Sequence, residues 1–233
     1  MTRVLRWLTA GAVVAAAAYG AFAIVTWRGF GNPPHPKPEE HDEDLDRFMP
    51  VYDVVERHHI RVNASADTTF VAACDMDLMR SSLSRAIFRS RGAMLGSQSA
   101  SRSDEHGLLA WTQSLGWGVL ADRPGREIVM GAVTRPWEAD VVFQALPPRE
   151  FARFDTPGFV KIVWTLRADP IGMSTSVFRT ETRAVATDAI ARARFRRYWS
   201  FLKPGIVAIR WMMLRPLKED AERRERELLE ATV

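Results

Sequence analysis

Two stretches of alternating polarity near the C-terminus constrain the fold of this chain more than any other feature. Along GFVKIVWTLRA, apolar side chains occupy every second position: Val160, Ile162, Trp164 and Leu166. STSVFRTETRAV alternates in the same way, and Asp169, Pro170 and Gly172 supply turn chemistry between the two. A period of two predicts neighbouring antiparallel strands with one apolar face. Such a face has to be covered by another element.

The segment after the second strand is predicted to be the helix that covers this face. Thr187 or Asp188 can cap its start. One apolar stripe follows at helical spacing: Ala191, Phe195, Tyr198, Trp199 and Leu202. Lys203 precedes Pro204, so we expect the helix to kink or restart there. The chain stays apolar up to residue 218, and residues 219–233 are predicted to form a charged, solvated tail.

Further strands and helices are predicted upstream. A strand is expected over residues 51–62, followed by two short helices, the first around Phe70 and the second containing Leu78, Leu83, Ile87 and Leu95. A hairpin is predicted from Trp117–Ala121 and Glu127–Thr134, because Asp122, Pro124 and Gly125 favour a turn. Asp140–Leu146 is a candidate sixth strand, and a short helix is expected around Phe151.

The N-terminus predicts a membrane anchor over residues 1–28. Trp7–Val25 is nineteen residues without a charge. As a helix it would span roughly 28 Å, close to the hydrocarbon thickness. Arg3 and Arg6 favour a cytoplasmic N-terminus and a domain on the extracytoplasmic side. Two alternatives stay open: Ala21-Phe22-Ala23 has the form of a cleavage site in a secreted protein, and the segment can be a buried helix.

Residues 29–50 are predicted to form a linker between this anchor and a domain over residues 51–218. Four prolines favour extended geometry, and the acidic block Glu39–Asp46 is expected to stay in water. His35 and His41 lack the recurring spacing of a metal site, so no metal ligand is assigned. The one cysteine, Cys74, excludes an intramolecular disulfide and a cysteine-built metal cage.

The order of these elements resembles the helix-grip (SRPBCC) superfamily, which includes START lipid-transfer domains, birch-pollen-type allergens and polyketide cyclases. The resemblance covers about residues 49–217. It is carried by VNASADTTFVAA, by the hairpin GVLADRPGREIVMGAV, and by FRTETRAVATDAIARARFRRYW at the junction of last strand and last helix. It implies an α+β fold in which a curved antiparallel sheet wraps around a long C-terminal helix. The space between them would hold a lipid or another apolar molecule.

Six side chains are expected to face that space and to contact a ligand. They are Trp117 (or Val119 in its place), Met130, Trp164, Phe178, Phe195 and Trp199. Large aromatics line apolar pockets, but they also fill solid cores, and both interpretations stay open at this point.

No catalytic motif is recognisable. The sequence has no phosphate-binding glycine loop, no Gly-x-Ser-x-Gly and no His-Glu-x-x-His, so no catalytic residue and no cofactor is assigned. His58 and His59 are adjacent on a strand and should point to opposite faces, where one of them could act as an acid or base. Glu181, between Arg179 and Arg183, could transfer a proton or form a cross-strand ion network on the solvent side of the sheet.

These observations together predict a membrane-anchored module that binds or transfers an apolar small molecule or lipid. A cyclase- or hydrolase-like enzyme and a structural interaction module are the alternatives. The basic stretch between residues 192 and 218 can be a solvated helix face or a second membrane contact. Nucleic acid is the less fitting partner for a tethered chain.

Overall fold

A computed structural model describes residues 2–77 and 107–231 of the chain. Along the sequence the elements are α1 (Thr2–Gly29), η1 (Pro38–Glu40), α2 (Glu43–Phe48), β1 (Val54–Val62), α3 (Ala66–Asp75), α5 (Leu108–Ser114), β2 (Gly118–Arg123), β3 (Glu127–Thr134), β4 (Phe143–Gln144), α6 (Pro148–Arg153), β5 (Val160–Gly172), β6 (Thr175–Ala186) and α7 (Ala189–Ala231). The first predicted short helix corresponds to α3. The second, around residues 78–95, lies outside the described residues.

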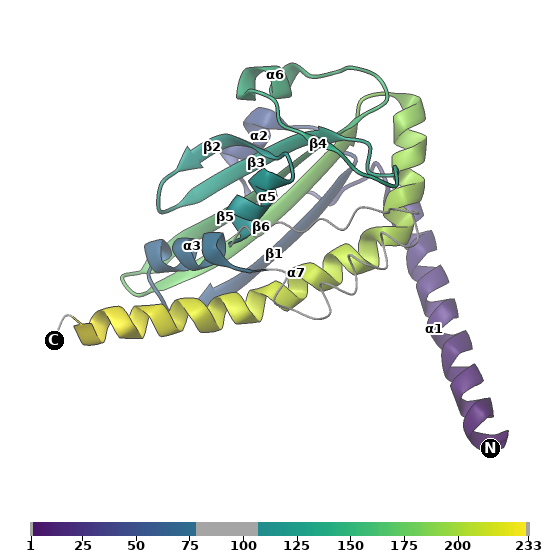
Figure 1. Cartoon of the computed structure of the whole chain (residues 1–233), viewed down its shortest axis with the longest axis horizontal. Coiled ribbons are helices and arrows are strands. Elements are labelled where there is room, and N and C mark those ends of the chain that lie inside the picture. Colours follow the sequence, from purple (N-terminus) through teal and green to yellow (C-terminus); the bar gives the residue numbers. More distant parts are fainter. Residues whose placement is uncertain (1, 78–106, 232–233) are drawn as a thin grey trace.

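The strands form one curved antiparallel sheet, as predicted (Figure 1). Its order is β1-β6-β5-β3-β2, with β4 pairing the far end of β3. The two alternating stretches are β5 and β6, which pair directly with each other. The predicted hairpin is β2–β3, and the candidate sixth strand is present as the two-residue β4. The α+β fold class with a long C-terminal helix is therefore confirmed.

One face of the sheet, here called the inner face, is covered by α3 and by the second part of α7. The strand register brings Met130, Trp164 and Thr182 side by side across three strands. The apolar side chains of this face join Phe70 of α3 and Leu214 and Leu217 of α7 in the largest hydrophobic cluster. This packing explains the alternation of apolar and polar residues in β5, because every second side chain of the strand faces the covering helices.

The opposite, outer face is covered by α2 and α6. Leu45, Phe48 and Met49 are at most 3% exposed and pack on Val129 and Val163 of the sheet. Asp42 accepts a hydrogen bond from the backbone of Leu45 at 2.9 Å and so caps α2. The expectation that this acidic segment stays solvated is therefore wrong at its C-terminal end. Its few apolar residues are spaced for one helix face and are buried against the sheet.

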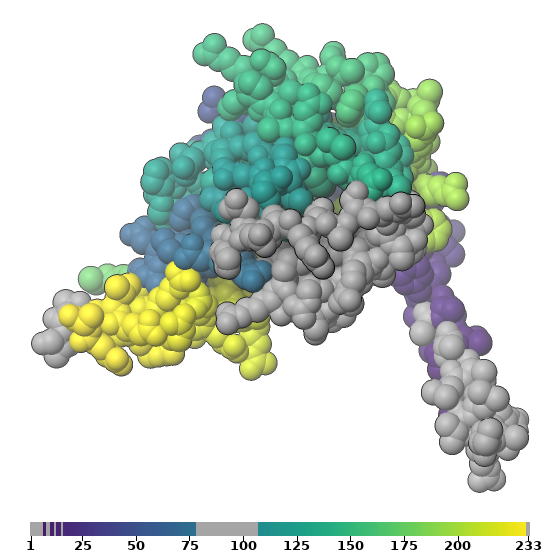
Figure 2. All heavy atoms as spheres, in the orientation of Figure 1, coloured from purple at the N-terminus to yellow at the C-terminus, as the bar shows by residue number. Residues whose placement is uncertain are grey.

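The helix α7 is 43 residues long and changes direction between its first and second parts (Figure 1). Pro204 and Pro216 lie inside it, which agrees with the predicted kink. The first part stands at one end of the sheet, where Phe195 and Trp199 pack with Phe30. The second part runs along α3, and its yellow end lies against the blue α3 in Figure 2.

The C-terminal end of α7 is docked on the domain, where a solvated tail was predicted. Leu217 and Ala221 are at most 1% exposed. The Glu225 carboxylate accepts hydrogen bonds from Ser65 at 3.1 Å and Thr68 at 2.6 Å, at the start of α3. The charges of this segment therefore serve as contacts to the domain and not only as a solvated surface.

The membrane-anchor prediction is overturned for residues 1–28. Within the parts of the chain that the structure describes, no helix is both long enough and apolar enough to cross a bilayer. The second half of α1 contacts protein instead: the Tyr19 hydroxyl donates to the Phe201 carbonyl, and the Trp27 carbonyl accepts from Arg196 at 2.8 Å. The extracytoplasmic placement of the domain, and the membrane as a partner of α1 or α7, depended on that anchor and are not supported.

Candidate functional site

The structure divides the six predicted ligand-contacting residues into two groups. Met130, Trp164 and Phe178 belong to the inner-face cluster, with Trp117 packed against it. The rings of Trp117 and Trp164 meet edge to face, 6.2 Å apart. Phe195 and Trp199 belong instead to the cluster at the end of the sheet. Trp117 is partly buried, and the other five are at most 7% exposed. Their role in contacting a ligand stays a prediction.

Ile162 lies on the inner face between these two groups. It is two residues from Trp164 along β5, and it is partly buried against the Phe195 and Trp199 cluster. Its cross-strand neighbours are both alanines, Ala132 and Ala184. The centre of the inner face thus carries small side chains between two aromatic groups.

A polar cluster interrupts the same face between β1, β6 and α7. Glu56 and His58 of β1 lie directly opposite Thr182 and Thr180 of β6. Residues directly opposite each other in an antiparallel pair share one face. We call these four, together with Lys203 and Arg210 of α7, the inner polar cluster.

Arg210 reaches from α7 to the sheet. Its guanidinium donates to the Thr180 hydroxyl at 2.6 Å and to the Thr182 hydroxyl. Burial is the largest cause that lowers the pKa of Arg210, to about 10, and Glu56 opposes this shift. Arg210 therefore remains a cation at neutral pH. Lys203, two turns earlier on the helix, pairs with Glu56 at 2.8 Å.

His58 is the buried imidazole of the cluster. The residue is 8% exposed, and its ring meets the ring of Trp211 edge to face at 5.7 Å. Nε2 lies 3.8 Å from the Glu56 carboxylate and has no hydrogen-bond partner among the described residues. Burial lowers the pKa of His58, and Arg210 lowers it further, while Glu56 raises it. The net direction favours a neutral imidazole, which can donate or accept a proton.

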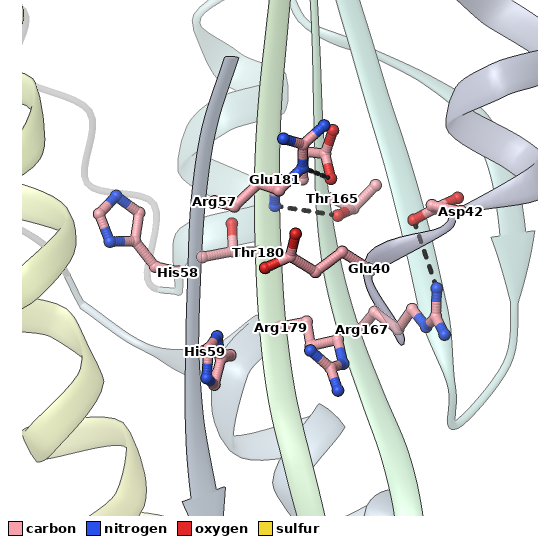
Figure 3. Close-up of a pocket in the computed structure, with 10 residues that line it drawn as sticks. All are labelled: Glu40, Asp42, Arg57, His58, His59, Thr165, Arg167, Arg179, Thr180 and Glu181. Carbon is pink, nitrogen blue, oxygen red and sulfur yellow. Dashed lines mark hydrogen bonds and ion pairs between the residues drawn. The ribbon is translucent and has the colours of Figure 1, made fainter. Parts of the chain in front are cut away.

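The expectation that His58 and His59 point to opposite faces is confirmed. His59 is exposed on the outer face, and His58 points away from the outer-face residues towards α7 (Figure 3). Arg210 was not identified from the sequence, although the signal was present. It lies eleven residues after Trp199, about three helical turns, and so shares the inward stripe that Trp199 marks. Because apolar residues surround Arg210 on nearly all sides of the helix in the sequence, its position on the inward stripe could not be recognised.

A second candidate region is a polar pocket on the outer face beneath η1 and α2 (Figure 3). Its cavity volume is only about 20 Å³, and it is open to solvent. Glu181 accepts from Arg57 at 2.9 Å and from Arg183 at 2.7 Å. Asp169 likewise accepts from Arg167 at 2.8 Å and Arg179 at 2.9 Å. In these ion pairs the two carboxylates partly offset the charges of the arginines around the pocket.

Glu181 therefore belongs to a cross-strand ion network, one of its two predicted roles. The network is buried, whereas the sequence suggested that it would face solvent: Arg183 is 1% exposed and also donates to Asp46 at 2.6 Å and to the Met49 carbonyl at 2.9 Å. These contacts fasten α2 to the sheet. The charged residues around the outer pocket therefore have a structural role, and the inner polar cluster is the stronger candidate for a functional site.

No metal centre is formed by the described residues, because they contain no group of three or more His, Cys, Asp or Glu side chains that could hold an ion. Cys74, on α3, packs against the inner-face cluster, and burial raises the pKa of its thiol to about 11. A thiol with so high a pKa is a poor nucleophile at neutral pH.

Comparisons with known proteins add little. No family model matches the chain, and no curated protein matches it. Among solved structures, a protein of Chromobacterium violaceum is 10% identical over 66% of this chain and 96% of its own, with a TM-score of 0.26. Norcoclaurine synthase of Thalictrum flavum, a point mutant with a transition-state analogue, is 12% identical over 73% of this chain and 94% of its own, with a TM-score of 0.25.

An aromatase/cyclase of a Streptomyces species is 10% identical over 73% of this chain and 94% of its own, with a TM-score of 0.23. TM-scores this low carry no argument about function.

Proposed function

We propose that the chain binds an apolar small molecule between the inner face of the sheet and α7. Ligand sites are largely apolar and contain a few convergent polar groups, often with shifted pKa values. The inner face matches this description: the aromatic groups around Trp164 and Trp199 surround a small polar cluster. The observation that carries the proposal is this cluster, in which a buried imidazole nitrogen of His58 lacks a hydrogen-bond partner within the described parts of the chain.

An uncharged fluorescent probe tests the proposal. N-phenyl-1-naphthylamine brightens when it leaves water for an apolar site, and its binding is measured by titration. The unmodified chain should bind the probe with saturation. Ile162→Trp should weaken binding about tenfold, because the larger ring fills the centre of the inner face between Ala132 and Ala184.

Val142→Trp is the matched control, because Val142 is 71% exposed and belongs to none of the three hydrophobic clusters of the described residues. This variant should bind the probe as the unmodified chain does. If the unmodified chain does not bind the probe at all, or if both tryptophan variants behave alike, the proposal is wrong. A structural interaction module with a solid core would then describe the chain better.

A second candidate function is an enzyme of the cyclase type, favoured by the neutral His58 beside Glu56. A neutral imidazole of this kind can take a proton from a bound ligand, and Glu56 can stabilise the imidazolium that forms. Hydrogen–deuterium exchange into a ligand recovered from the protein, lost in His58→Gln, would separate an enzyme from a binding module.

A further inference from the structure

We infer that the ligand of the inner site carries an anionic group of the carboxylate type, and that the guanidinium of Arg210 binds it. This inference rests on the proposed function and specifies the ligand's chemistry. Its basis is an imbalance of charge at the inner face.

The first observation is the pairing of charges in the inner polar cluster. Glu56 is paired with Lys203 at 2.8 Å. Arg210 donates only to the neutral hydroxyls of Thr180 and Thr182 among the described residues. With His58 neutral, two cations and one carboxylate give this cluster a net charge of about +1. One monovalent anion would balance it.

The second observation is how the chain treats Arg183, an arginine that is 1% exposed. Arg183 on the outer face donates to two carboxylates, Glu181 and Asp46, and to a backbone carbonyl. A buried cation without a carboxylate is costly, since burial removes its hydration and neutral hydroxyls replace only part of it. Arg210, which is half-buried, bears part of this cost in the free protein. The cost is expected at a position that pairs with a charge brought by a ligand.

The third observation is the free hydrogen-bonding position on His58. Its Nε2 has no hydrogen-bond partner in residues 2–77 and 107–231, and His58 lies opposite Thr180, the residue that Arg210 contacts at 2.6 Å. In the tautomer that carries its hydrogen on Nε2, the imidazole can donate to one carboxylate oxygen while the guanidinium donates to the other. The two donors reach the site from opposite sides, one from β1 and one from α7.

The residues next to the inner polar cluster determine the chemistry expected of the rest of the ligand. Trp164, Met130 and Phe178 make the adjoining part of the inner face apolar. The ligand class that matches both parts is an amphipathic acid, with an apolar body and one carboxylate. A neutral apolar molecule would leave Arg210 without a carboxylate among the described residues, and a dianion would exceed the charge available.

A matched pair of probes tests the inference: 11-(dansylamino)undecanoate and its methyl ester, which share the apolar body and differ in charge. Affinities are measured by dansyl fluorescence. The unmodified chain should bind the acid at least about tenfold more tightly than the ester, as expected for a charge-assisted hydrogen-bonded pair. Arg210→Met should bring the two affinities within about twofold of each other by weakening the acid alone. Arg210→Lys should retain part of the preference, since it keeps the charge but loses the fork of donors.

The control is Arg215→Met, on the same helix but with a side chain that is 85% exposed. It should keep the full preference for the acid. Arg210→Met should also melt no lower than the unmodified chain, because it removes a half-buried cation that has no carboxylate partner among the residues that the structure describes. A variant that still binds the ester normally is thereby shown to be folded.

The outcomes separate the inference from the proposed function. If acid and ester bind equally well, the anion site is wrong and the apolar site stands. If Arg215→Met loses the preference as Arg210→Met does, the effect is general helix charge and the inference is again wrong. If neither probe binds, the proposed function fails, and this inference fails with it.

Discussion

At the scale of single residues, Glu127 has the most perturbed carboxyl group in the described chain. It begins β3 on the outer face and is 4% exposed. Burial, together with a hydrogen bond and charge repulsion from Asp42, raises its pKa from 4.5 to about 8, while Arg167 lowers it. The folded protein therefore binds this proton more tightly than the unfolded chain does.

This difference predicts that the protein loses stability as the pH rises from about 4.5 to about 8. In that window the folded state keeps a proton that the unfolded chain has released. The slope is at most about 1.4 kcal/mol per pH unit for one group. Glu127→Gln should flatten the slope and be the more stable form at pH 8, as measured by urea unfolding at a series of pH values. Glu138→Gln, at an exposed site, should leave the slope unchanged.

If Glu127→Gln shows the same pH dependence as the unmodified chain, Glu127 is not the group that titrates. The experiment is independent of any ligand, because Glu127 lies on the outer face and the proposed ligand site on the inner face.

Residue-level features were predictable where a local pattern determines them. His58 and His59 had to face opposite sides of a strand, and Trp164 had to share a face with Ile162, because side chains alternate along β-strands. The partners of a charged residue depend on which distant segment folds over it. Nothing near Arg210 in the sequence shows that Thr180 and Thr182 lie beneath it.

At the scale of elements, α2 is the clearest case in which composition misled. Its acidic residues predicted a solvated linker. In the structure they occupy the N-cap and the polar side of a helix of about one and a half turns. Leu45, Phe48 and Met49 stand at helical spacing and are buried. Three apolar residues in a short stretch are too few to stand out by periodicity, whereas the long alternation of β5 and β6 is distinct from any helix pattern.

The role of α2 predicts the effect of Leu45→Ala. Leu45 is fully buried against the outer face, so the substitution should leave a cavity and cost about 2–5 kcal/mol of the free energy of unfolding. Val51→Ala, at a position 76% exposed, should cost less than about 0.5 kcal/mol. Chemical denaturation of both variants measures the difference. Equal, small costs would mean that α2 is not docked in solution.

At the scale of the whole molecule, the sheet is covered on both faces, and its central strands are hydrogen-bonded on both sides. We therefore expect amide hydrogen exchange to be slowest in β5 and fastest, among the longer strands, in β2 at the edge. The difference should be at least about tenfold in protection, read by mass spectrometry of peptic fragments. Exchange in β2 as slow as in β5 would contradict this layering.

The general plan of the molecule was readable from the sequence because each part of it has a local signature. Strand, hairpin, paired strands and terminal helix all appear in the predicted order. The long-range packing was not readable. α1 lies against α7, and the last turns of α7 contact the start of α3. No pattern within either segment of these pairs indicates its partner.

The pairing of β1 with β6 has a consequence for how the chain is made. Arg57 and Glu181, neighbours in the sheet, are separated by 124 residues. During synthesis β1 leaves the ribosome long before β6, the strand that pairs with it. Until β6 emerges, the backbone N–H and C=O groups of β1 have no strand to pair with. The newborn chain therefore passes through a period in which β1 can pair with foreign strands, and shielding by chaperones should matter most until β6 has emerged.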